Sequence, residues 1–332
     1  MKENLLQKIQ DKSIVHSTLQ PSNERRSRDS TLQLFNPSTD MKPVRKAVIP
    51  AAGFGTRFLP ATKCSPKEML PIVDTPVIQY VVEEAVASGI TDILIVIGRG
   101  KRAIEEHFDR SCELEWELEA KGKIRELQII RRISNLANIH FVWQKQMLGL
   151  GDAVRCAELH VGDEPFAVLL GDTLLQSTSD VPACRQLIDA YEETGTSVVA
   201  MEEVPLERVS KYGVLKGEPE KGKIGSISDL VEKPAPEEAP SRMVIASRYV
   251  LTPDIFPALH QVRPGKGGEI QLTDALKMLA HANPIHGRVI DAIRHDVGNH
   301  MGFIKTNILY GLNRPDLRET LAQFIKEIAA TL

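Results

Sequence analysis

From Val44 onward, short apolar runs alternate with longer segments of helical periodicity, and this alternation constrains the fold more than any other feature. The runs KAVIPAA, DILIVIG, IHFVW, FAVLLGD and TSVVAM are typical of buried strands. Between them, apolar residues recur at helical spacing, as in VIQYVVEEAVASG, which closes with Gly89. Strands that alternate with helices predict an α/β fold whose mostly parallel mixed sheet carries helices on both faces.

Three regions follow from composition and pattern. Residues 1–43 are rich in Ser, Asn, Gln and charged residues, so we expect a disordered N-terminal extension, with a short helix in ENLLQKIQDK as an option. Residues 44–312 form the predicted main domain, and residues 313–332 a C-terminal helical segment. Within the main domain, YGVLKG, KIGSISDLVEKP and MVIASRYVL predict a smaller β region around residues 205–251.

Composition narrows the class of partner. The 332 residues carry a formal net charge of -3, with a pI near 6.3, so no basic field favours nucleic acid. No apolar run reaches the roughly 18 residues of a membrane span, and no signal-peptide core is present, so we expect a cytoplasmic protein without a membrane partner. The four cysteines are widely spaced, which predicts neither a zinc site nor a disulfide framework.

The stretch PAAGFGTRFLPATKCSPKEMLP follows the first predicted strand and suits no regular element. Glycines directly after a strand let backbone N–H groups approach a phosphate or a base. A dinucleotide-binding G-x-G-x-x-G would need glycine at Phe58, and a Walker A loop would need Gly-Lys-Ser/Thr, which is absent. The loop carries three cations, Arg57, Lys63 and Lys67. They suit a polyanion, although a solvated basic loop would show the same charges.

The loop GFGTRFLPATKCSPKEMLP closely resembles the signature loop of bacterial sugar-1-phosphate nucleotidyltransferases. The resemblance continues, in order, through VIQYVVEEAVASGI, GLGDAV, VGDEPFAVLLGD, YGV, VEKP, SRYVL, GEIQLTDAL and DVGN. It implies a Rossmann-like nucleotidyltransferase fold. PKEMLP, VEKP and EIQLTDAL resemble the UTP:glucose branch of this family most closely.

For that branch, the implied reaction is reversible transfer of uridylyl from UTP to glucose 1-phosphate, which gives UDP-glucose and pyrophosphate. Two polyanions must be held in line, so the site should combine cations with Mg²⁺. The resemblance also implies a homodimer or homotetramer. Two alternatives stay open at this point: a sugar nucleotidyltransferase that uses dTTP, and a non-catalytic regulatory paralogue.

The resemblance assigns roles to particular residues. The catalytic set it implies is Arg57, Lys67, Asp172 and Lys233. The nucleotide-binding set is Ala51, Ala52, Gly53, Gly55, Thr56, Gln144 and Gly149. The sugar-binding set is Gly213, Glu232 and Lys233, and the Mg²⁺ ligands are Asp172 and Asp296.

Residue chemistry leaves simpler explanations for some of these positions. Asp172 ends FAVLLGD, where an Asp is also common as a helix cap or turn residue. Glu232 and Lys233 would otherwise be taken as an exposed ion pair. The resembled pattern departs at three positions, where family members often carry a basic residue, a Lys and a His: Trp143, Leu148 and Asp152.

Overall fold

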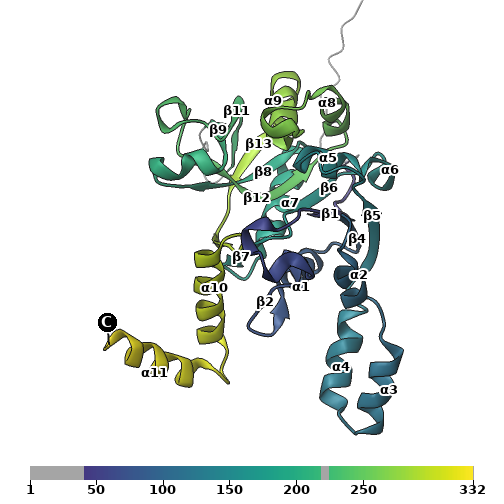
Figure 1. Ribbon diagram of the computed structural model, residues 1–332. Coiled ribbons are helices and arrows are strands. Elements are labelled where there is room, and N and C mark those ends of the chain that lie inside the picture. Colours follow the sequence, from purple (N-terminus) through teal and green to yellow (C-terminus); the bar gives the residue numbers. More distant parts are fainter. Residues whose placement is uncertain (1–40, 218–223, 332) are drawn as a thin grey trace, which may run out of the picture. The chain divides into compact units, whose positions relative to one another are not determined.

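The structure is a computed structural model that describes residues 41–217 and 224–331 (Figure 1). The extension predicted over residues 1–43 therefore falls almost entirely outside the described residues, as does the optional helix in ENLLQKIQDK. Among the helices that are described, none is long and apolar enough to cross a membrane.

A ten-stranded sheet forms the centre of the fold, with the path β10-β13-β8-β12-β6-β1-β4-β5 and with β9 and β11 added beside β12. Its strands are β1 (Lys46–Ala51), β4 (Asp92–Ile97), β5 (Asn138–Trp143), β6 (Phe166–Leu169), β8 (Val198–Glu203), β9 (Gly213–Lys216), β10 (Ile224–Ser226), β11 (Asp229–Glu232), β12 (Met243–Leu251) and β13 (His286–Val289). The pairings show that β13, β8, β6, β1, β4 and β5 run in one direction, whereas β12 and β10 run in the other. The predicted mostly parallel mixed sheet is confirmed.

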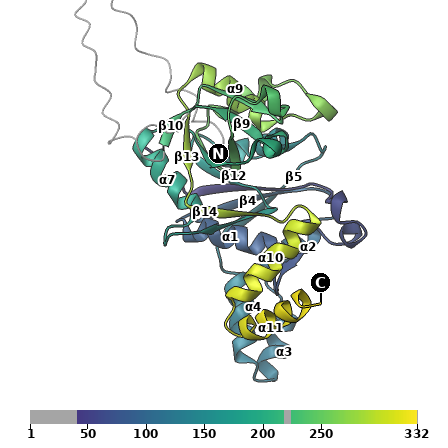
Figure 2. The same ribbon diagram turned by 90° about the vertical axis from the view of Figure 1, so that its left-hand side faces the viewer.

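Helices cover both faces of this sheet. The helices are α1 (Val77–Ala87), α2 (Arg102–Phe108), α3 (Cys112–Ala120), α4 (Ile124–Ile133), α5 (Leu150–Arg155), α6 (Glu158–Val161), α7 (Ala183–Thr194), α8 (Ile255–Gln261), α9 (Leu272–Ala282), α10 (His300–Asn313) and α11 (Arg318–Ala329). Figure 2 shows α1 on one side of the sheet and α9 on the other.

The pleat of β1 explains why two apolar cores form. Ile49 points into the core that contains α1 and α7, whereas its neighbour Val48 points into the core of α5, α8 and α9. Successive side chains of a strand face opposite sides, so an apolar strand must be covered twice. In α1, the predicted apolar stripe is buried from Val77 to Ala85, and the helix ends before Gly89, whose φ is 90°.

Two short antiparallel sheets lie outside the central one. The first pairs β2 (Pro71–Ile72) with β3 (Thr75–Pro76). The second pairs β7 (Thr173–Ser177) with β14 (Ala292–Asp296), and its register sets Asp296 opposite Thr173. This pairing therefore brings the end of RHD to the residue that follows Asp172, across a long separation in sequence.

Candidate active site

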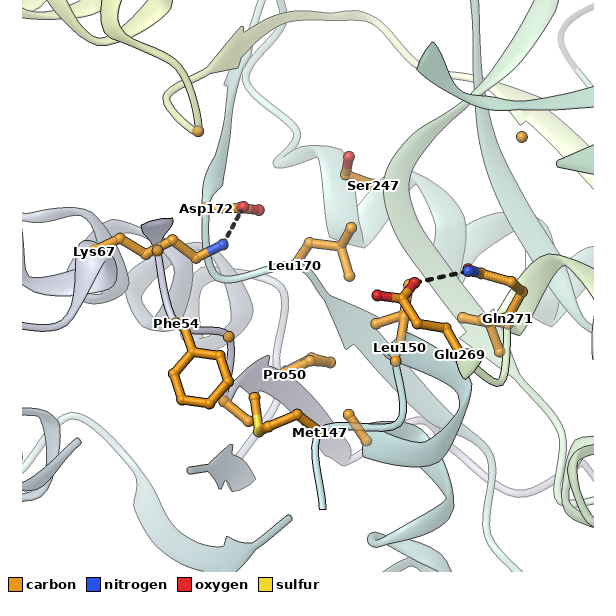
Figure 3. Close-up of a pocket in the computed structure, with 18 of the residues that line it drawn as sticks. Pro50, Phe54, Lys67, Met147, Leu150, Leu170, Asp172, Ser247, Glu269 and Gln271 are labelled. Atoms are coloured by element: carbon orange, nitrogen blue, oxygen red, sulfur yellow. Dashed lines mark hydrogen bonds and ion pairs between the residues drawn. The ribbon is translucent and has the colours of Figure 1, made fainter. Parts of the chain in front are cut away.

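A cavity of about 670 Å³ opens where β1, β5 and β6 end. Its walls include residues 52–58 after β1, residues of the segment 144–150 after β5, and Leu170 and Asp172 after β6 (Figure 3). The far wall comes from the smaller β region and from the segment that precedes and begins α9. Ligands of parallel α/β sheets bind at this edge, outside the carboxyl ends of the strands.

Most of the residues singled out from the sequence line this cavity. They are Ala52, Gly53, Gly55, Thr56, Arg57, Lys67, Gln144, Gly149, Asp172, Gly213, Glu232 and Lys233. Ala51 and Asp296 are not among the lining residues. Ala51 is 1% exposed and pairs with Ile97 inside the sheet, whereas Asp296 lies just behind the wall, as described below.

The loop after β1 folds as three single turns of 3-10 helix, Thr56–Phe58, Ala61–Lys63 and Lys67–Met69. Gly55 begins the first turn with φ of 66°, and a Cβ there would lie 3.0 Å from Cβ of Lys67. Glycine is thus needed both for the left-handed backbone and for the close approach. Thr62 donates to the Gly55 carbonyl at 2.8 Å, which closes the loop and returns Lys67 to the cavity. Lys63 is exposed and outside the lining.

Lys67 and Asp172 form the charged centre of the cavity. Nζ of Lys67 donates to Oδ2 of Asp172 at 2.6 Å (Figure 3). Burial alone lowers the pKa of Lys67, but the carboxylates of Asp172 and Glu68 outweigh it, so this pKa lies above its ordinary value. Burial raises the pKa of Asp172, but Lys67 outweighs burial and holds it below its ordinary value. Both groups are therefore charged around neutral pH.

A buried ion pair between Glu68 and Lys101 lies next to Lys67. Glu68, 1% exposed, accepts from Nζ of Lys101 at 2.7 Å and lies 3.9 Å from Nζ of Lys67. Burial raises the pKa of Glu68, and Lys101 and Lys67 oppose that shift. Sequence reasoning missed Lys101. The only available signal was its position in the basic segment GRGKR after β4, which is also typical of an exposed loop.

Arg248 fixes the turn that carries Asp172. Its guanidinium is fully buried and pairs with Glu84 of α1 at 2.6 Å. It also donates to the carbonyls of Leu170 and Thr173, at 3.4 and 2.9 Å, on either side of Asp172. The motif SRYVL contains this arginine. The sequence alone does not show that an arginine inside an apolar strand forms hydrogen bonds with the turn around Asp172.

The two predicted metal ligands lie close together. The point where a Cβ would stand on Gly298 is 3.2 Å from Oδ1 of Asp296 and 3.3 Å from Oδ2 of Asp172. Nη1 of Arg57 lies 3.9 Å from the same point and donates to the Gly298 carbonyl at 3.4 Å. Glycine at 298 therefore leaves open the space between two carboxylates and a guanidinium.

This donor set, two carboxylates beside a cavity, suits Mg²⁺. Mg²⁺ binds through one or two carboxylates, with phosphate oxygens and waters completing its coordination. Across residues 41–217 and 224–331, no group of three or more His, Cys, Asp or Glu side chains is arranged to hold a metal. A metal held by these two carboxylates would complete its coordination with phosphate oxygens or waters.

The residues predicted to bind the sugar form a second polar group, at the β9–β11 hairpin. Oε2 of Glu232 accepts from Thr273 at 2.7 Å, and Oε1 lies 3.0 Å from Nζ of Lys233. A Cβ on Gly213 would lie 3.3 Å from Oε2 of Glu232 and 2.8 Å from Ile245. Lys233 has φ of 46°, which is rare outside glycine, so the hairpin holds its backbone in a costly conformation.

At the β5 side of the cavity, Gln144 is 5% exposed and donates to the Gly149 carbonyl at 3.1 Å and to Asp152 at 2.8 Å. Gly149 has φ of 96°, and a Cβ there would lie 2.8 Å from Cβ of Glu269. The backbone N–H of Ile270 donates to Leu148 at 2.6 Å. The segment that leads into α9 therefore packs directly on the glycine turn.

Comparison with known proteins agrees with this architecture. The model of the nucleotidyl transferase family matches residues 46–311, so the chain belongs to the nucleotidyl transferase family. The family and the fold class predicted from the sequence are confirmed.

Individual relatives are more specific. The UTP–glucose-1-phosphate uridylyltransferase YngB of Bacillus subtilis (strain 168) is 54% identical over 287 residues, covering 86% of this chain and 96% of the relative. A crystal structure of UDP-glucose pyrophosphorylase complexed with UDP-glucose matches with a TM-score of 0.76 at 45% identity, covering 82% of this chain and 100% of that one. The UTP-bound UGPase from Acinetobacter baumannii matches with a TM-score of 0.78 at 38% identity, covering 86% and 99%.

Proposed function

We propose that this chain is a UTP–glucose-1-phosphate uridylyltransferase, which makes UDP-glucose and pyrophosphate. The observation that carries the proposal is one cavity with three parts: the Lys67–Asp172 pair in the middle, Gln144 on one side, and Glu232 with Lys233 on the other. A base, a reacting phosphate and a sugar need three such parts. Relatives at 38 to 54% identity are named for UTP, glucose 1-phosphate or UDP-glucose.

The proposed reaction is a single in-line displacement. A phosphate oxygen of glucose 1-phosphate forms a bond to the α-phosphorus of UTP, and the bond from that phosphorus to the β-phosphate oxygen breaks. Its electron pair leaves with pyrophosphate, so no protein nucleophile is needed and the reverse reaction follows the same path. Catalysis then rests on positioning and on charge stabilisation.

The loop after β1 supplies the phosphate contacts in this proposal. Lys67 stabilises the charge that builds on the α-phosphate, and Arg57, which is exposed at the cavity, contacts the β- or γ-phosphate. Main-chain N–H groups hold the nucleotide at Ala52, Gly53, Gly55 and Thr56. Ala51 belongs to the same predicted set, but its burial in β1 restricts it to supporting that backbone.

The proposal includes Mg²⁺, with Asp172 and Asp296 as its protein ligands. When bound, the ion neutralises phosphate charge and orients the oxygens of the triphosphate. Asp172 is paired with Lys67 in this structure, so the two residues share one place near the α-phosphate. The proximity of both carboxylates to Gly298 supports this assignment.

On the sugar side, Glu232 accepts hydrogen bonds from glucose hydroxyls, and Lys233 contacts the sugar phosphate. Gly213 leaves room for the hexose, since any side chain there would meet Ile245 and Thr273. The left-handed backbone of Lys233 supports a functional role, because strained backbone conformations cluster at active sites and ligand-binding positions.

The two alternatives are not favoured. The relatives at 38 to 54% identity are named for UTP or UDP-glucose, and a regulatory paralogue would not need the charged centre that is present. The homodimer or homotetramer and the cytoplasmic location stay predictions.

The test is pyrophosphate release by the purified full chain with glucose 1-phosphate and Mg²⁺, with UTP, dTTP, ATP and GTP side by side and an EDTA control. We expect EDTA-sensitive turnover that prefers UTP. Preference for dTTP would move the chain to the thymidylyl alternative, and no turnover with any nucleotide would support the regulatory one.

A further inference from the structure

The side-chain amide of Gln144 has one possible orientation. Its Nε2 lies 3.1 Å from the Gly149 carbonyl oxygen and 2.8 Å from Oδ2 of Asp152. Both partners are acceptors, so the NH₂ group must face them, and the opposite orientation would set Oε1 against two other oxygens. The chemistry of the neighbours therefore assigns the amide, whereas most amides are ambiguous.

Asp152 is itself held in place. It is 6% exposed in the first turn of α5, and its second oxygen, Oδ1, accepts from Nη2 of Arg155 at 2.5 Å. Each carboxylate oxygen thus has its own partner: Oδ1 faces Arg155, and Oδ2 faces Gln144. An arginine at this distance pairs with a carboxylate, which has no proton to donate.

The other end of the Gln144 amide is left for a ligand. Oε1 has no hydrogen-bond donor among the described residues. It is nevertheless not a buried unpartnered atom, because in the described part of the chain the only such side-chain atom is Nε of Arg288. Oε1 therefore keeps accessible surface, and Gln144 lines the cavity. The base side of the cavity consequently presents an acceptor.

We propose that Asp152 is a positioning residue that sets the base specificity of the site through Gln144. This inference rests on the proposed function. With its amide held by Asp152, Gln144 accepts from a base that carries a ring N–H, as uracil and thymine do at N3. Cytosine has an unprotonated N3, which would face Oε1 as a second acceptor.

The size of the effect follows from one hydrogen bond. A partner that leaves a polar group unpaired in a desolvated site costs about 1–3 kcal/mol, which corresponds to about 5-fold to 150-fold in affinity. Uracil and thymine share the N3–H. Asp152 should therefore favour the binding of UTP over CTP and have no effect on the relative affinities for UTP and dTTP.

The informative variant is Asp152→Asn. Arg155 still donates to Oδ1 of the asparagine side chain. The NH₂ group of that asparagine therefore turns toward Gln144 and donates where the native carboxylate accepts. The amide of Gln144 then keeps only the Gly149 carbonyl as an acceptor and meets a donor in place of the Asp152 carboxylate, so its orientation is no longer fixed by both neighbours. Asp152→Glu keeps a carboxylate, and Asp163→Asn is a matched control, because Asp163 is a surface carboxylate with a side chain 90% exposed.

The experiment measures dissociation constants of UTP, dTTP and CTP by calorimetry on the full chain and on each variant, with circular dichroism to check folding. For the wild type, we expect UTP to bind at least about tenfold more tightly than CTP. For Asp152→Asn, we expect the preference for UTP over CTP, measured as the dissociation constant of CTP divided by that of UTP, to fall by about tenfold or more. The same ratio for dTTP and UTP should stay within about twofold of the wild-type value. Asp163→Asn should match the wild type, and Asp152→Glu should retain part of the preference.

Two results would overturn the inference: a wild type that binds UTP and CTP equally, or a folded Asp152→Asn protein with an unchanged UTP-to-CTP ratio. If Asp152→Asn does not fold, Asp152→Ala, which removes the acceptor and adds no donor, is measured in the same way. Binding needs no turnover, so an inactive protein that still selects UTP over CTP would contradict the proposed reaction and leave this inference standing.

Discussion

The most informative perturbation of the charged centre is Lys67→Met. Methionine keeps an unbranched stem, so packing against Gly55 is largely preserved, whereas the ammonium group is removed. The lysine side chain is 23% exposed and its Nζ lies 2.6 Å from Asp172, inside the cavity where the proposed α-phosphate reacts. Its charge is therefore screened less than that of a surface lysine.

The expected loss follows from the proposed role. Removing one preorganised donor to a developing negative charge typically lowers kcat by about 10²–10³, or about 3–4 kcal/mol of transition-state stabilisation. Because the contact strengthens in the transition state, kcat should fall more than KM rises. Lys63→Met is the matched control: Lys63 lies in the same loop and is exposed, so its variant should stay within about twofold of the wild type.

The assay is steady-state pyrophosphate release with UTP and glucose 1-phosphate, together with thermal melting of each variant. Asp172 loses its partner in Lys67→Met but is 31% exposed, so the fold should survive. A folded Lys67→Met protein that keeps more than about one-tenth of the wild-type kcat would refute the assignment of Lys67 to the reacting phosphate.

Three further predictions concern the support of this centre. Arg248→Met leaves Glu84 buried without its partner, so urea unfolding should show a loss of about 3–5 kcal/mol; Arg242→Met, which breaks an exposed ion pair, should cost no more than about 1 kcal/mol, and equal losses would contradict the argument. Asp296→Asn should raise the Mg²⁺ concentration for half-maximal activity by about tenfold or more, since even residues behind a metal ligand contribute that much; an unchanged Mg²⁺ titration would remove Asp296 from the metal site. Because the pKa of Lys67 is raised above 10.5, its share of stability is present below that pH and is lost as pH rises through the folded-state pKa. Because the pKa of Asp172 is lowered below 3.8, its share is present above that pH and is lost as pH falls. Between pH 5 and 9, the contribution of this pair to the free energy of unfolding in urea should therefore not depend on pH. A pH-dependent change in that range that disappears in Asp172→Asn would contradict these shifts.

The sequence predicts the middle of the central sheet well because β1, β4 and β6 are buried on both faces and read as continuous apolar runs. It is a poor guide to α3. There Leu114, Trp116 and Leu118 alternate with glutamates, which is the period of a strand. In the structure this segment is a helix, and buried Glu115 accepts from Arg110 and from Arg131 of α4, tertiary contacts that the local periodicity does not show.

The candidate site shows the same division. The loop after β1 and the residues at strand ends were predictable, because motif spacing and strand polarity are local properties. The ion pairs of Lys67 with Asp172 and of Arg248 with Glu84 join segments far apart in sequence, and only the folded sheet brings them together. The β7–β14 register that carries Asp296 to Asp172 is likewise a tertiary feature.

In the proposed reaction, uridylyl is transferred directly and in line to glucose 1-phosphate at this cavity. This transfer is tested most directly by the stereochemistry at the α-phosphorus, with one diastereomer of UTP that carries sulfur on that phosphorus and phosphorus NMR of the product. Direct transfer predicts a UDP-glucose analogue with inverted configuration, formed by the wild type in the presence of Mg²⁺. Retained configuration would indicate a covalent uridylyl-protein intermediate, and absence of that product would contradict the proposed reaction.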